Sequence, residues 1–337
     1  MDDGQSVAGP ASASAPASRA ESPGGTRPTV IYIAGSGRCG STLLERVLGE
    51  IPGYVNVGEL IQLARQMAPH NDRCGCGQAF TDCPFWTAVG ERAFGGWDSQ
   101  SLESVREMEG RVARQHYLQG VPAVQQAGRA DLAALGTWYE RLLRAVAAES
   151  GAAYVVDASK EMRQALLFAG AGIDVRVIHL IRDVRGVAFS MSKRHAESPD
   201  PVNRTEMTWR TAPALAAALW VGVLSEEKQL RRRGVPVARM RYEDFVRQPH
   251  AAIEQALGQL GLSVDPSALT HIGDGRVTLP SSHGLSGNPS RFRQGELTLR
   301  PDEAWRDQMS RRDRFIVTMI GLRYLRRYYG RRAMPLA

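Results

Sequence analysis

The sequence predicts one α/β domain built around a parallel sheet. Short apolar runs typical of buried parallel strands occur at 30–33, 154–156, 175–181 and 235–240. Polar and charged residues follow these runs, and the carboxyl ends of parallel strands form the edge at which ligands collect. A chain of 337 residues can bury one large core, or one core with an inserted subdomain. We therefore expect an α/β fold with a central parallel sheet, plus a mostly helical, cysteine-bearing insertion.

The stretch 30–48, VIYIAGSGRCGSTLLERVL, combines a strand, a glycine loop and the start of a helix. Gly35, Gly37 and Gly40 allow a tight turn after the strand, and an amphipathic helix begins at Ser41. The N–H groups of such a loop and of the helix N-terminus converge on one point, where the helix dipole adds about half a positive charge. The stretch predicts a site for a phosphate-like anion, and a glycine turn without a ligand is the simpler alternative.

Composition predicts the domain boundaries. Residues 1–27 are rich in Ala, Ser, Pro and Gly without periodicity, and we expect a disordered tail there. The domain is expected over 28–330, with an insertion and helical region at 69–150 and a short tail at 331–337. The chain does not start like a signal peptide, and its longest later apolar run, 212–224, contains a proline and is too short to span a bilayer. We therefore expect a cytoplasmic protein without a membrane span.

The net charge is +7, from 42 Lys and Arg against 35 Asp and Glu. This balance suits a protein that handles a multiply charged nucleotide or an acidic acceptor. The basic residues are dispersed apart from 231–233 and a few near the C-terminus, and charge runs are more often solvated faces than binding stripes. Nucleic acid is therefore not predicted as a partner.

The glycine loop lacks the lysine that precedes Ser41 in the nucleotide-hydrolase motif GxxxxGK[ST]. Its order, Arg-Cys-Gly-Ser-Thr-Leu-Leu over 38–44, resembles the R-x-G-[ST]-T-L loop of sulfotransferases that use 3′-phosphoadenosine 5′-phosphosulfate (PAPS). The resemblance implies a P-loop, three-layer α/β/α fold. It also implies that the 5′-phosphosulfate is held by Ser36, Gly37, Arg38, Cys39, Gly40, Ser41 and Thr42.

A second match to the same family follows the run 175–181. There Arg182 stands at the strand end and Ser190 follows eight residues later, as in the family signature that binds the 3′-phosphate of PAPS. An arginine fork matches phosphate oxygens bidentately, and a serine two turns into the next helix can add a hydroxyl donor. The spacing from the first loop and the strand-to-helix setting both support the resemblance.

Two further strand ends carry candidate catalytic residues. Glu59 follows the run 54–57, and in the tyrosylprotein branch of the family a Gly-Glu at this spacing from the loop Arg carries the base. Lys160 ends the pattern D-x-S-K that many members place near the sulfuryl group. The structural alternatives are a helix-capping carboxylate at Glu59 and an ion pair between Lys160 and Asp157. Competing bases are the histidines, chiefly His70, His271 and His283.

The segment 69–97 is expected to be an irregular excursion from the sheet that shapes the acceptor pocket. It holds Cys74, Cys76 and Cys83, with His70 upstream as a fourth possible zinc ligand. The spacing does not match common zinc knuckles. Free thiols or a pair that oxidises are the alternatives, and no metal is predicted.

The last third of the chain adds weaker features. Tyr242, at the strand end Arg-Tyr-Glu-Asp-Phe, would lie against the nucleotide by the resemblance, or would simply be a core residue. The segment 278–300 has too many Gly, Ser and Pro residues for regular structure, and the resemblance implies that Arg291 and Arg293 there complete the 3′-phosphate site. A final helix over 302–329 should pack on the sheet through the apolar stripe Ile316, Met319, Ile320 and Leu325.

Taken together, these matches predict a PAPS-dependent sulfotransferase that moves a sulfuryl group to a hydroxyl acceptor. Arg38 and Lys160 would neutralise the leaving group, Glu59 would take the acceptor proton, and no metal would be needed. A P-loop small-molecule kinase and a non-catalytic nucleotide-binding module are the alternatives. A lipid, sugar, phenol or peptide acceptor is compatible with the sequence, and the oligomeric state stays open.

Overall fold

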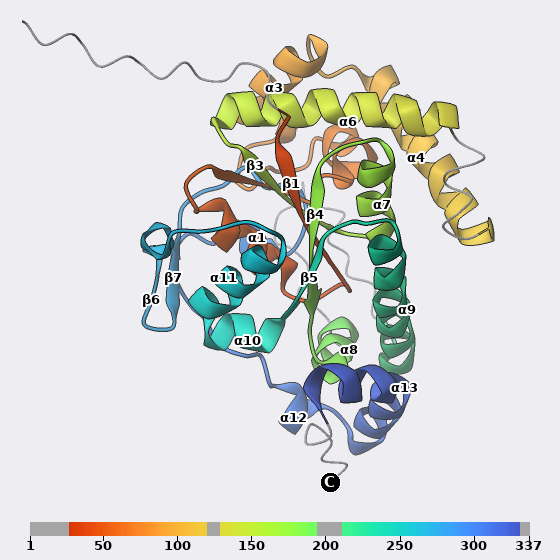
Figure 1. The fold of residues 1–337 in the computed structure, drawn as a ribbon, viewed down its shortest axis with the longest axis vertical. Helices are drawn as coiled ribbons and strands as arrows, with labels where there is room; N and C mark the ends of the chain where they lie inside the picture. Colours follow the sequence, from red (N-terminus) through yellow and green to blue (C-terminus); the bar gives the residue numbers. More distant parts are fainter. Residues whose placement is uncertain (1–26, 120–128, 194–210, 331–337) are drawn as a thin grey trace, which may run out of the picture.

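The computed structural model describes residues 27–119, 129–193 and 211–330 (Figure 1). Its centre is a five-stranded sheet in the order β2-β3-β1-β4-β5, in which every neighbouring pair is parallel. The strands are β1 (Thr29–Gly35), β2 (Tyr54–Gly58), β3 (Tyr154–Lys160), β4 (Val175–Ile181) and β5 (Val237–Arg241). The sheet confirms the predicted α/β class, and the two sequence matches fall on neighbouring strands, β1 and β4.

Helices cover both faces of the sheet, so the architecture has three layers (Figure 1). Alternate residues of β1 point to opposite faces, as the two-residue period of a strand requires. Val30 and Tyr32 belong to one apolar cluster, and Ile31 and Ile33 belong to another. The first cluster includes residues of α6 (Arg129–Ser150) and α7 (Met162–Gly170), and the second includes residues of α1 (Ser41–Gly49), α10 (Tyr242–Arg247) and α11 (Pro249–Gln259).

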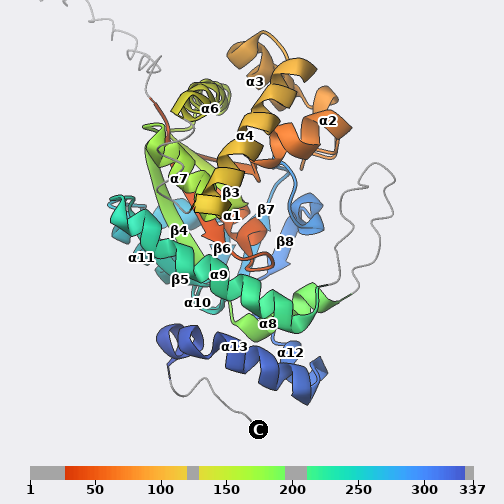
Figure 2. The ribbon, with the colours of Figure 1, turned by 90° about the vertical axis from the view of Figure 1, so that its right-hand side faces the viewer.

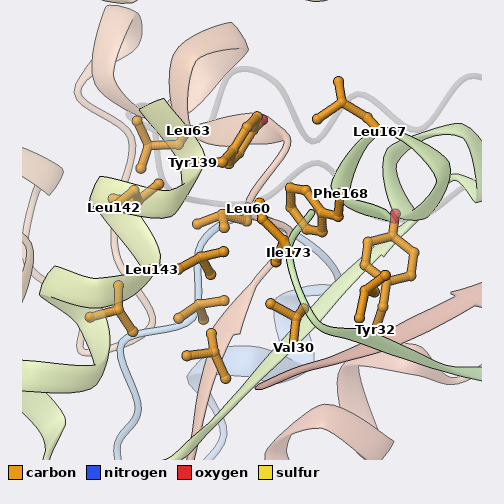
Figure 3. Packing of buried hydrophobic residues seen from close by; sticks show 14 of the residues in the cluster. Val30, Tyr32, Leu60, Leu63, Tyr139, Leu142, Leu143, Leu167, Phe168 and Ile173 are labelled. Carbon is orange, nitrogen blue, oxygen red and sulfur yellow. The ribbon is translucent and has the colours of Figure 1, made fainter. Parts of the chain in front are cut away.

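Figure 3 shows the first cluster from close by. Tyr139 and Leu142 of α6 and Phe168 of α7 approach Val30 and Tyr32 of β1. The ring of Phe168 meets Tyr32 edge-on, with centroids 6.2 Å apart and an interplanar angle of 88°. The phenol of Tyr32 is still satisfied, since it donates a 2.8 Å hydrogen bond to the carbonyl of Glu161.

The segment 69–97 is more regular than the sequence indicates. After β2 the chain forms a π-helical turn (Leu63–Met67), α2 (Ala68–His70), a 3-10 turn (Phe80–Asp82), α3 (Pro84–Phe94) and α4 (Ser99–Gln119). The expectation of an irregular excursion holds only around the cysteines. Pro84 explains the difference, because proline at the first helical position starts α3 instead of breaking it.

The final helix is split and packs differently from the prediction. It consists of α12 (Trp305–Gln308) and α13 (Arg311–Tyr329), and α13 lies on α8 (Val184–Ser192) and α9 (Pro213–Arg232) instead of on the sheet (Figure 2). Its buried residues are Val317, Thr318, Gly321 and Leu325, whereas Met319 and Ile320 of the predicted stripe are 46% and 38% exposed.

Gly321 determines which face of α13 packs against α8. A Cβ added at Gly321 would lie 2.8 Å from Cγ1 of Val184, so only a residue without a side chain allows α13 to approach α8 this closely. The hydrophobic pattern was therefore a poor guide, because the closest contact of the helix is made where an apolar side chain is missing.

The segment 278–300 also contains regular structure, contrary to the prediction. A small antiparallel sheet joins β6 (Ile272–Gly273), β7 (Arg276–Leu279) and β8 (Gly295–Thr298), with 3-10 turns at Pro266–Leu269 and Pro289–Phe292. Among the described residues no helix is long and apolar enough to cross a membrane.

Candidate active site

The glycine loop forms one turn between β1 and α1. Gly40 has φ +100° and Arg38 has φ +63°, both in the left-handed region. A Cβ at Gly40 would lie 2.5 Å from the ring of Tyr242, so the loop and this ring are in direct contact. Gly40 has no side chain to cap α1, and the first N–H groups of that helix are therefore suited to an anionic ligand.

Substitution of Gly40 should show how much this turn depends on glycine. We expect Gly40→Ala to lower stability by about 1–3 kcal/mol, because it combines a left-handed backbone with a clash against Tyr242. Gly37→Ala is the matched control, since a Cβ there meets nothing within 4 Å. Urea unfolding of both variants measures the difference, and equal midpoints would contradict the assigned loop geometry.

Arg182 joins the loop to the neighbouring strand end. Its Nη1 donates to the carbonyl of Arg38 at 2.9 Å, and its Nη2 donates to Oδ2 of Asp302 at 2.9 Å. Its guanidinium also lies 4.8 Å from the ring centroid of Tyr242. The structure thus places Arg182 and Tyr242 beside the loop, and their binding of a nucleotide stays a prediction. Asp302 is a partner of Arg182 that the sequence did not indicate. Ser190 lies half-buried near the end of α8.

A cavity of about 180 Å³ adjoins this arginine. Arg182 and Gly186 line it together with Asp302 and Trp305, and a Cβ on Gly186 would approach Nε of Arg182 to 3.2 Å. None of the loop residues 36–42 lines the cavity. Arg182 thus links the cavity to the glycine loop, because it lines the cavity and also bonds the carbonyl of Arg38.

Glu59 and Lys160 form an ion pair at the carboxyl edge of the sheet. Their side chains are 12% and 20% exposed, and Nζ of Lys160 contacts Oε1 of Glu59. Burial lowers the pKa of Lys160, but the contact with Glu59 outweighs burial, so that the pKa is raised and the amine stays charged. Lys160 holds φ +68°, an unfavourable conformation for a lysine that often marks a functional site.

Asp157 is not the partner of Lys160, so that alternative is wrong. Its Oδ1 accepts hydrogen bonds from Ser159 and, at 3.3 Å, from the N–H of Leu60. Burial raises the pKa of Asp157 to about 7. This carboxyl group therefore supports the turn that carries Glu59.

Glu45 is a nearby carboxyl group that was not among the predicted site residues. It lies on α1, 2% exposed, and burial followed by repulsion from Glu59 raises its pKa well above the usual range. One signal was present in the sequence, since a glutamate stands within the apolar pattern of α1. A neutral Glu45 beside a charged Glu59 would leave the ion pair with Lys160 intact.

The loop 280–292 crosses both the glycine loop and Glu59. Leu285 accepts from the N–H of Glu59 at 2.7 Å and donates to the carbonyl of Val57 at 2.9 Å. Three residues later the N–H of Asn288 donates to Oγ1 of Thr42 at 3.3 Å. This loop therefore covers Glu59 and the start of α1.

The two arginines of this region differ in their setting. Arg291 is 2% exposed and its Nη1 donates to the carbonyl of Gly287 at 3.1 Å, so it stabilises its own loop. Arg293 is exposed. Their role toward a 3′-phosphate stays a prediction.

The competing histidines lie elsewhere. His271 places Nε2 3.0 Å from the carbonyl of Val47, and His70 is exposed at the end of α2. His283 turns Nδ1 toward Cys74 and Cys83. His70, the possible fourth zinc ligand, therefore lies outside the cysteine group, and the histidine that joins the group is His283.

The fold and this site define a class of protein: a phosphate-loop α/β protein with cations and a carboxylate gathered at one sheet edge. A model described as the sulfotransferase family matches residues 28–266. The chain therefore belongs to the sulfotransferase family and is a sulfotransferase of the PAPS-dependent kind.

Solved structures give weaker likenesses. The sulfotransferase domain of the Synechococcus PCC 7002 olefin synthase is 18% identical, with 91% of this chain and 98% of that chain covered and a TM-score of 0.44. The sulfotransferase domain of the curacin biosynthetic pathway is 16% identical, with 88% and 97% covered and a TM-score of 0.46. Sulfotransferase STF9 from Mycobacterium avium is 14% identical, with 90% and 76% covered and a TM-score of 0.42. The search of curated proteins gave no match.

Proposed function

We propose that this sulfotransferase moves the sulfuryl group of PAPS to a hydroxyl acceptor at the Glu59–Lys160 pair. The acceptor oxygen forms a bond to sulfur on one side while the bond from sulfur to the bridging oxygen of the donor breaks on the other. The acceptor proton passes to Glu59, and 3′-phosphoadenosine 5′-phosphate leaves. The observation that carries the proposal is the contact of a partly buried carboxylate and a partly buried ammonium under a loop that also bonds Thr42 of the glycine loop.

The proposal places the cations on the donor side of the sulfuryl group and the carboxylate of Glu59 on the acceptor side. In the transition state negative charge spreads over the sulfuryl oxygens and the leaving phosphate, so cations and N–H groups there lower the barrier. Arg38, Lys160 and the loop amides are proposed for that role, with Ser41 and Thr42 as further ligands. The sulfuryl group carries less charge than a transferred phosphoryl group, so no metal takes part in the transfer step of this proposal.

The ion pair between Lys160 and Glu59 suggests that the donor binds before the base becomes available. Lys160 contacts the proposed base directly, so in the protein without donor the carboxylate of Glu59 is engaged by the ammonium. When the anionic donor binds, the ammonium can turn to the sulfuryl oxygens and release the carboxylate to the acceptor. The proposed base is thereby freed only after the donor is in place.

Nucleotide selectivity tests the proposed donor site. We expect 3′-phosphoadenosine 5′-phosphate to bind at least about tenfold more tightly than AMP or ADP, because each charge-assisted contact to the 3′-phosphate contributes about 1.5–3 kcal/mol. Titration calorimetry with the three nucleotides measures this preference. Arg182→Gln should reduce it, and the exposed Arg232 provides the control variant Arg232→Gln. Equal affinities in the unmodified protein would contradict the site.

A further inference from the structure

Three cysteines of the insertion meet one histidine of the loop 280–292. Cys74, Cys76, Cys83 and His283 place their ligand atoms within 4.8 Å of one another. Sγ of Cys83 lies 3.3 Å from Nδ1 of His283, 3.6 Å from Sγ of Cys74 and 3.8 Å from Sγ of Cys76. Sγ of Cys74 lies 3.8 Å from Nδ1 of His283. The four side chains thus surround one point from two distant parts of the chain.

These separations match the edges of a zinc tetrahedron. Zn–S bonds of about 2.3 Å and Zn–N bonds of about 2.0–2.1 Å place neighbouring sulfurs about 3.8 Å apart, and a sulfur and a nitrogen about 3.5 Å apart. A disulfide requires sulfurs about 2.05 Å apart, and it would use only two of the three thiols. A metal ion accounts for all four groups at once.

The backbone is arranged to support thiolate ligands. A nearby main-chain N–H favours negative charge on each sulfur: that of Cys76 at Cys74, that of Gln78 at Cys76, and that of Trp86 at Cys83. A tight turn produces the first two of these contacts, since the N–H of Cys74 donates to the carbonyl of Gln78 at 2.8 Å. Such outer contacts orient metal ligands and stabilise their charge.

Two contacts orient the histidine, His283. Its ring stacks on Phe85 at 4.9 Å between centroids and 13° between planes, and its carbonyl accepts from Nε1 of Trp86 at 2.8 Å. These two contacts hold Nδ1 toward the sulfurs. Cys74 and Cys83 are fully buried, so an ion held here would be shielded from water.

We propose that Cys74, Cys76, Cys83 and His283 bind one structural Zn²⁺ ion. All four tetrahedral positions are filled by protein atoms, which is the arrangement of a closed, structural site and leaves no position for a substrate. The site is therefore separate from the sulfuryl transfer chemistry. It also lies outside the sequence prediction, which favoured thiols without a metal.

The zinc ion would fasten the covering loop to the insertion. Two residues after His283, Leu285 pairs with the chain on both sides of Gly58, and a Cβ on Gly58 would approach its N–H to 2.2 Å. A second link is the hydrogen bond from Gly75 to the carbonyl of Gly284, at 3.0 Å. The metal thereby maintains the backbone position of Glu59 from a distance.

Metal analysis of the purified full-length protein tests this proposal without any activity measurement. We expect about one zinc per chain by mass spectrometry of the elements, and at least about fivefold less in Cys83→Ser and in His283→Ala. Cys39→Ser and His271→Ala are the matched controls, since both residues lie outside the cluster. Less than about one tenth of a zinc per chain in the unmodified protein, after expression in zinc-supplemented medium, would overturn the proposal.

Cobalt replacement keeps the test decisive if the variants do not fold. Co²⁺ introduced into the unmodified chain should show thiolate-to-cobalt charge transfer and the intense absorption of a tetrahedral ion. A weak octahedral spectrum, or an intact mass two daltons below that of the reduced chain, would contradict the site. Removal of the metal should also increase amide hydrogen exchange at Leu285 and Glu59, and unchanged exchange would refute the link between the zinc and the covering loop.

Discussion

Glu59→Gln is expected to lower sulfuryl transfer by about two to four orders of magnitude and to change the affinity for 3′-phosphoadenosine 5′-phosphate only a few-fold. Glutamine keeps the shape of the side chain and can still bond to Lys160, but it cannot accept the acceptor proton. Single-turnover transfer from labelled PAPS measures the rate, and calorimetry measures the affinity. The exposed Glu254 of α11 supplies the control variant Glu254→Gln.

Glu45 allows this prediction to be separated from a general effect of charge. Burial raises the pKa of Glu45 well above its usual range, which favours the protonated form, and that form cannot serve as a base. Glutamine resembles a protonated glutamate, and Glu45→Gln should therefore retain transfer within a few-fold. Near-normal transfer in Glu59→Gln combined with an inactive Glu45→Gln would move the base from β2 to α1.

Lys160→Ala is expected to reduce kcat by about 10²- to 10³-fold, with a smaller effect on KM for PAPS. The ammonium is proposed to stabilise charge that develops during transfer, and such a contact contributes more to the transition state than to the bound donor. Alanine and lysine carry a similar cost at φ +68°, so the backbone of β3 should tolerate the change.

Steady-state kinetics with both substrates distinguishes the roles of this residue. Lys228→Ala is the control, because Lys228 is an exposed lysine of α9. A loss confined to KM would show that Lys160 only binds the donor. If Lys160→Ala lowered the melting temperature but left kcat and KM unchanged, the Glu59–Lys160 contact would be structural.

The local sequence was sufficient to predict the phosphate loop and the sheet. In 30–48 the strand, the glycines and the helix are neighbours in the chain, so their arrangement depends on backbone conformation over a few residues. The spacing from Arg182 to Ser190 is likewise a local property. Parallel strands then bring Arg38 and Arg182 to one edge of the sheet without further information.

Contacts between distant segments were the part that local patterns could not predict. Lys160 contacts Glu59 and not the closer Asp157, because β2 and β3 are neighbours in the sheet and Asp157 is used by the turn at Leu60. In the same way His283, about 200 residues after the nearest cysteine, joins the cysteine group, although His70 is closer in the chain.

The sequence by itself determined that this protein has a strand, a glycine loop and a helix suited to an anion, and that it belongs with the sulfotransferases. Only the tertiary structure decided which side chains share a site: the Glu59–Lys160 pair, the loop that crosses Thr42, and the group of three cysteines and His283. The physical reason is that helices, strands and turns depend on interactions within about one to two turns of chain, whereas pairing between distant segments depends on how the whole core packs.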